Sequence, residues 1–65
     1  MYYKLYFETE AKALAFIEEI NNLGYEWNPY KMYRIEKGMY QDSWCIEYNA
    51  TAKASKEIER YYFGS

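Results

Sequence analysis

Side chains that could perform acid–base or nucleophilic chemistry are few in this sequence, and their spacing does not suit it. The 65 residues include a single cysteine, Cys45, and no histidine, so no histidine base can activate a serine or a thiol. Cys45 falls within an alternating apolar segment, where a small packing residue is expected. Glu18 and Glu19 are adjacent on a predicted helix, where neighbouring side chains diverge. We therefore predict no catalytic residues and no enzymatic activity.

Metal and phosphate sites are equally unsupported. A tetrahedral zinc site takes most of its ligands from cysteine and histidine, and Glu36 and Asp42 alone are too few oxygen ligands for a hard cation. The three glycines, Gly24, Gly38 and Gly64, lie too far apart to form a phosphate-binding loop. The sequence thus predicts no metal ion and no cofactor.

The overall charge and hydropathy argue against two further classes of partner. The formal net charge is −2 and the pI is near 5.0, whereas nucleic-acid binders normally show a basic face or a basic pI. No stretch approaches the roughly 20 apolar residues of a membrane span, and residues 1–7 lack the regions of a signal peptide. A lone thiol is typical of a reducing compartment. We expect a cytoplasmic protein that binds no membrane, and nucleic acid is a disfavoured partner.

The first two elements follow from hydrophobic periodicity. Residues 2–7 are aromatic and alternate, which predicts a strand. Residues 9–23 predict a helix, with Thr9 as its N-cap and Gly24 as its left-handed end. One face of the strand carries Tyr3, Leu5 and Phe7. The apolar stripe of the helix consists of Ala13, Phe16, Ile17, Ile20 and Leu23.

The middle of the chain predicts a hairpin. Residues 25–37 form an extended segment that Pro29 places at a sheet edge or a bulge, because proline cannot donate to a ladder. The Lys37-Gly38 pair favours a tight turn into a strand over residues 39–49, and a wider turn over residues 37–43 is the alternative. The tight turn pairs Ile35 with Tyr40 and Tyr33 with Asp42. It places Tyr33 and Ile35 on the same face as Trp44, Ile46 and Tyr48.

Residues 51–62 predict a second, shorter helix, and the element order is therefore β-α-β-β-α. Thr51 or Asn49 would cap this helix, and Ala54, Ile58 and Tyr61 or Tyr62 mark its apolar side. We predict one small α+β domain over residues 1–65. Its three-stranded mixed sheet has the order 2-3-1 and carries both helices on one face. The order 3-2-1 is the alternative if Pro29 falls outside the ladder.

Aromatic residues exceed what such a domain can bury. Ten tyrosines, two tryptophans and three phenylalanines are present, whereas one small helix-on-sheet layer buries about eight or nine large side chains. The surplus falls on the sheet face that no helix covers, and tyrosine, methionine and arginine are enriched at protein interfaces. The predicted partner-binding residues on this face and at the hairpin tip are Tyr2, Lys4, Tyr6, Tyr30, Met32, Arg34, Met39, Tyr40, Asp42 and Glu47.

These features favour a protein-binding module. A compact, acidic domain of this size is similar in kind to small phage or mobile-element inhibitors that block host nucleases and immune effectors, including CRISPR systems. That likeness is one of size and composition, includes no motif, and transfers no functional residues. One alternative is a structural or regulatory homodimer, because small domains often need self-association for stability. Another is a single-stranded nucleic-acid binder that stacks bases on Tyr2 and Tyr6.

Overall fold

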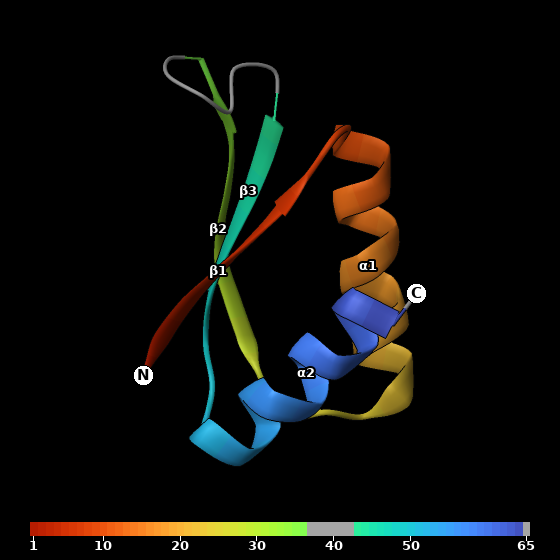
Figure 1. Ribbon diagram of the computed structural model, residues 1–65, viewed down its shortest axis with the longest axis vertical. Coiled ribbons are helices and arrows are strands. Elements are labelled where there is room, and N and C mark those ends of the chain that lie inside the picture. The colour runs from red at the N-terminus through yellow and green to blue at the C-terminus, as the bar shows by residue number, and fades with distance from the viewer. Residues whose placement is uncertain (37–42, 65) are drawn as a thin grey trace.

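Three strands form one sheet, and two helices cover one of its faces (Figure 1). The computed structural model describes residues 1–36 and 43–64. The elements are β1 (Tyr2–Phe7), α1 (Glu10–Leu23), β2 (Asn28–Ile35), β3 (Ser43–Asn49) and α2 (Ala52–Gly64). The strand order β1-β3-β2 confirms the predicted order, read from the other edge. The expected mixed sheet is wrong, because β3 lies between the other two strands and pairs antiparallel with both.

Helix α1 begins and ends where the sequence predicts. The Thr9 hydroxyl oxygen accepts a hydrogen bond from the Lys12 backbone N–H at 3.1 Å, which satisfies one of the free donors of the first turn. Gly24 closes the helix with φ of +82°, a conformation that glycine adopts without steric cost, and its N–H donates to the Asn21 carbonyl. Along the predicted stripe, Ala13, Phe16 and Ile20 are buried, Ile17 is half-buried and Leu23 is exposed.

Helix α2, the last element of the chain, packs on the core through its buried residues. Its first turn is capped by Thr51, whose hydroxyl oxygen accepts from the Ala54 N–H at 3.2 Å. Ile58 has no exposed surface, and the buried Ser55 lies 3.4 Å from the Tyr48 hydroxyl. The Tyr62 hydroxyl donates to the backbone carbonyl of Tyr6 in β1. These contacts join the last helix to the central strand and to the first strand.

The core between the sheet and the helices is built largely from aromatic rings. Tyr48 is fully buried, and its ring packs against Tyr3 and Trp27 at centroid distances of 5.4 and 5.2 Å. Rings at such spacings stabilise a core beyond the area they bury. The buried members of this cluster are Leu5, Phe16, Ile20, Tyr48, Ala50 and Ile58. The half-buried side chains packed against it are Tyr3, Phe7, Tyr25, Trp27, Ala54, Tyr61 and Tyr62.

The pairing of β2 with β3 differs from the predicted tight hairpin. Tyr33 lies opposite Cys45 rather than Asp42, and Ile35 lies opposite Ser43 rather than Tyr40. This register excludes the tight turn. The alternative, a wider turn over residues 37–43, lies mostly outside the described residues, and Ser43 at its end already belongs to β3. The partner of Tyr33 is therefore three positions further along β3 than expected, and a shift by an odd number moves side chains to the other face of a sheet.

A bulge at the start of β2 returns one side chain, that of Tyr30, to the sheet face that the sequence predicts for it. The register steps from Pro29 opposite Tyr48 to Lys31 opposite Glu47, which leaves Tyr30 as the extra residue. Pro29 thus sits in an edge strand beside a bulge, as the sequence predicts. Because of the bulge, Tyr30 lies on the uncovered face even though Met32 does not.

Candidate interaction surface

The face of the sheet away from the helices is arranged in cross-strand rows, because residues paired across a ladder share a face. We call this surface the open face. The central row contains Lys4, Glu47 and Lys31, from β1, β3 and β2. The row beside it contains Tyr6, Cys45 and Tyr33. On the other side of the central row lie Tyr2, Asn49 and Asn28, with Tyr30 added by the bulge.

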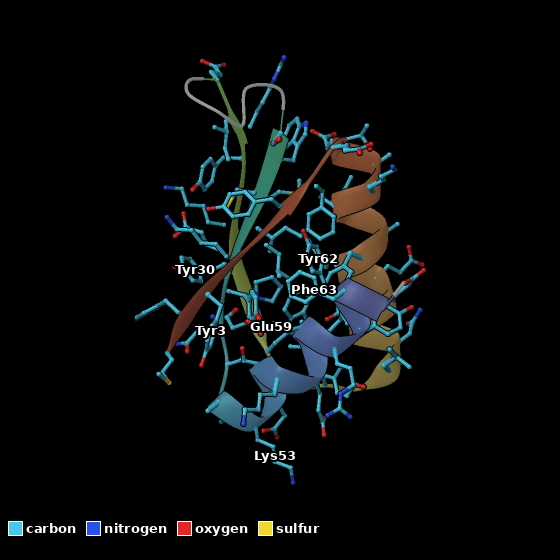
Figure 2. All side chains as sticks on the ribbon, in the orientation of Figure 1. Tyr3, Tyr30, Lys53, Glu59, Tyr62 and Phe63 are labelled. Carbon is cyan, nitrogen blue, oxygen red and sulfur yellow. The ribbon has the colours of Figure 1, made fainter. Side chains whose placement is uncertain are left out.

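Three tyrosines of the open face expose much of their surface. Tyr2 is 73% exposed, Tyr30 47% and Tyr6 39%. Tyr2 and Tyr30 meet edge to face with centroids 5.7 Å apart, and Figure 2 shows Tyr30 on the side of the strands away from both helices. The pair holds a fixed shape on the strands, so little conformational entropy is lost when a partner contacts it.

The centre of the open face is polar and internally hydrogen-bonded. The Tyr30 hydroxyl donates to the Glu47 carboxylate at 3.4 Å. Hydrogen bonds to Cys45 and Glu47, together with loss of hydration, raise the pKa of the Tyr33 hydroxyl. The Lys31 ammonium lies 5.0 Å from the centre of the Tyr33 ring, within the range of a cation–π contact. Glu47 is therefore already engaged by its neighbours.

Cys45 lies beneath this polar layer and has no exposed surface. Burial raises the pKa of its thiol, and the hydrogen bond from Tyr33 offsets part of that rise. A buried thiol with a raised pKa carries little thiolate, so it is a poor nucleophile. The packing role predicted for Cys45 matches this position.

Five of the predicted partner-binding residues come together on the open face: Tyr2, Lys4, Tyr6, Tyr30 and Glu47. Met32 and Arg34 are placed wrongly by the sequence analysis. They lie opposite Ile46 and Trp44 on the helix side of the sheet, because the register of β2 is shifted. Met39, Tyr40 and Asp42, predicted at the hairpin tip, lie outside the described residues.

The sequence analysis missed three members of the open face. Tyr33 and Ile35 were expected in the core, and Lys31 was not among the predicted partner-binding residues. All three lie on the open face. A signal was present in the eight residues between Ile35 and Trp44, which give room for a wider turn than Lys37-Gly38 alone requires. The bulge itself has no signal in the sequence apart from Pro29.

A separate surface, on the helix side of the sheet, contains a depression of about 630 Å³. Its aromatic lining comes from the end of β1, from α1 and from the end of α2, and includes Phe7, Phe16, Tyr62 and the 77% exposed Phe63. The salt bridge between Lys12 and Glu8, at 3.1 Å, lies on its rim. This groove shares no charged side chain with the centre of the open face.

The described part of the chain shows no cluster of side chains that could hold a metal ion. Within residues 1–36 and 43–64, no three of the Cys, Asp and Glu side chains are close enough to hold a metal ion. Neither described helix is long and apolar enough to cross a membrane. No protein-family model matches the sequence, and searches of curated proteins and of solved structures found no match.

Proposed function

We propose that this chain is a non-catalytic protein-binding module that contacts its partner through the open face. The observation that carries the proposal is the exposure of Tyr2, Tyr6 and Tyr30 on a sheet face that no helix covers. Tyrosine supplies a large apolar ring and a polar hydroxyl at one position, and it is enriched where proteins bind each other.

The construction of the open face also supports this choice of surface. Its side chains stand on paired strands, which hold them more firmly than a loop would. The aromatic groove on the helix side is the competing surface. Its walls include Phe7 and Phe16, which also pack in the core, so these two rings already serve folding.

A narrower form of the proposal is an inhibitor of a host defence or nucleic-acid-processing protein. A domain without catalytic groups can act only by occupying a surface that its partner needs. The small size and acidic composition support this form, and the unpaired buried thiol of Cys45 is in keeping with a cytoplasmic setting.

The test is capture of a partner followed by measurement with purified components. Wild-type chain is used to isolate a partner, which is identified by mass spectrometry, purified and titrated by calorimetry. The double variant Tyr2→Ala/Tyr30→Ala should weaken binding by about 2 kcal/mol or more, the range of interface hot spots. The control Phe63→Ala removes an exposed ring from the helix side and should bind as wild type does.

Two results would overturn the proposal. If the double variant binds as tightly as wild type while Phe63→Ala loses affinity, the helix-side groove is the contact surface. If no partner is captured and light scattering shows a wild-type dimer that Tyr2→Ala/Tyr30→Ala dissociates, the open face joins two copies of this chain. The homodimer alternative would then replace the module.

A further inference from the structure

We propose that the occupant of the open face is an acidic protein surface, whose carboxylates meet Lys4 and Lys31. This inference rests on the proposed function and specifies the chemistry of the partner. It starts from an asymmetry of charge. The only charged members of the open face within the three strands are Lys4, Lys31 and Glu47, which together give +1. The whole chain carries −2, so all residues other than these three together carry −3.

The two lysines are available to a partner because Glu47 does not neutralise them. Its carboxylate accepts a hydrogen bond from the Tyr30 hydroxyl at 3.4 Å. In residues 1–36 and 43–64, the salt bridge within 4.0 Å joins Lys12 to Glu8, and neither Lys4 nor Lys31 forms one. Both ammonium groups therefore keep donors that an incoming carboxylate can accept from.

The geometry of the open face fixes where such carboxylates must lie. Lys4 and Lys31 belong to the two outer strands and flank Glu47 on the central strand. Neighbouring strands are about 4.8 Å apart, so the two lysine backbones are about 10 Å apart. The tyrosine rows lie on either side of this charged row. A complementary surface presents two carboxylates at that spacing and apolar groups beside them.

An acidic protein suits this pattern better than the other occupants do. A nucleic-acid strand repeats its phosphates beyond the two lysines and would run onto the acidic remainder of the chain. A second copy would bring two open faces of the same sign together, with each Glu47 already engaged by the Tyr30 hydroxyl. A protein can confine its negative charges to the two positions that the lysines define.

The experiment is a titration of the ¹⁵N-labelled full chain followed by NMR. The probes are an octaglutamate peptide, octathymidylate and a neutral glycine–serine octapeptide, each at low and at high salt. Octaglutamate should shift the backbone amides of β1, β2 and β3 around Lys4, Glu47 and Lys31. The shifts should diminish at high salt, and the neutral peptide should cause none.

Matched variants isolate the role of the two lysines. Lys4→Gln/Lys31→Gln should weaken octaglutamate binding about fivefold, as expected for the loss of two exposed ion pairs. Lys53→Gln/Lys56→Gln changes the net charge equally on α2, where both lysines are exposed, and should weaken binding less than twofold. Figure 2 shows Lys53 at the end of the molecule where α2 begins.

Each other outcome would overturn the inference. Equal effects of the two double variants would mean that only net charge matters. Tighter binding of octathymidylate on the same amides would identify a nucleic acid as the occupant. Shifts that depend on protein concentration without any probe would identify a second copy. An absence of shifts on the open face would remove the acidic partner altogether.

Failure of this inference can be distinguished from failure of the proposed function. Both lysine variants are also titrated against the purified partner from the capture experiment. If Tyr2→Ala/Tyr30→Ala loses the partner and Lys4→Gln/Lys31→Gln retains it, the open face is the binding surface but its partner is not acidic. If neither variant changes partner binding, the open face is not the surface.

Discussion

The single thiol of Cys45 provides a direct test of how the open face is built. Its side chain has no exposed surface, and Tyr6 and Tyr33 lie opposite it on the two neighbouring strands. Truncation in Tyr33→Ala removes one of these rings. We expect this variant to let a thiol reagent reach Cys45 without unfolding of the domain.

The magnitude follows from the stability of a domain of this size. A chain of 65 residues is expected to have an unfolding free energy of about 3–10 kcal/mol. If Cys45 reacts only after global unfolding, native wild type should react at least about a hundredfold more slowly than unfolded chain, since 1.4 kcal/mol is tenfold. Tyr33→Ala should cost about 1–2 kcal/mol. That loss alone accelerates the reaction about 5- to 30-fold.

The assay separates local access from loss of stability. The reaction of Cys45 with a chromogenic disulfide is followed at increasing urea concentrations. A rate governed by global unfolding rises steeply with urea, whereas a rate governed by local access does not. Wild type and the control Tyr33→Phe, which keeps the ring, should show the steep dependence. Tyr33→Ala should show a flat rate at low urea that exceeds the acceleration expected from its stability loss.

The result that would refute this reasoning is a steep urea dependence in Tyr33→Ala with an acceleration no greater than its measured loss of stability. Tyr33 would then not cover Cys45. The register that pairs Tyr33 with Cys45, and with it the membership of the open face, would be wrong.

Two further predictions concern the packing of α2 and the buried hydroxyl groups. Ile58→Ala should lower the free energy of unfolding, measured by urea denaturation, by about 2–5 kcal/mol because Ile58 is fully buried. The control Leu14→Ala, at a 49% exposed site, should change it by less than about 0.5 kcal/mol. Equal effects of the two substitutions would contradict the packing of α2 on the core. Burial raises the pKa of Tyr48 above its ordinary value of 10.0, so the protonated hydroxyl stabilises the folded state, and that contribution is complete below pH 10 and lost as the pH rises through the folded pKa. Urea denaturation at a series of pH values above 10 should therefore show a steeper loss of stability in wild type than in Tyr48→Phe, and identical slopes would show that the folded state does not perturb this tyrosine.

Elements with a single apolar face were predictable from the sequence. In α1, the spacing of Ala13, Phe16 and Ile20 leaves one orientation that buries them, and Thr9 and Gly24 mark its ends. In β1, Leu5 and its neighbours alternate with more polar residues, so the sequence determines which face of the strand is buried. The position of Pro29 correctly indicated that β2 is an edge strand.

Strand β2 could not be placed in the same way because each of its faces carries both apolar and charged residues. Met32 occupies one face, and Tyr33 and Ile35 occupy the other, so burial alone does not decide which face meets the helices. The turn length then determines the register, and two turn lengths were compatible with the sequence. The bulge at Tyr30 adds a second change of phase that alternation does not reveal. Two of the expected partner-binding residues, Met32 and Arg34, were therefore assigned to the wrong face.

The place of β1 in the sheet has a consequence for the order in which the chain folds. Tyr2 pairs with Asn49 and Phe7 with Trp44, so the ladder of the first strand is closed by residues from the later part of the chain. Such non-local pairing is slow to form, and a growing chain presents its N-terminal end first. During synthesis, β1 can pair only after β3 has been made. The Tyr6 carbonyl can accept its hydrogen bond only later, when Tyr62 has been added. We therefore expect the domain to become stable only when nearly all of it has been made.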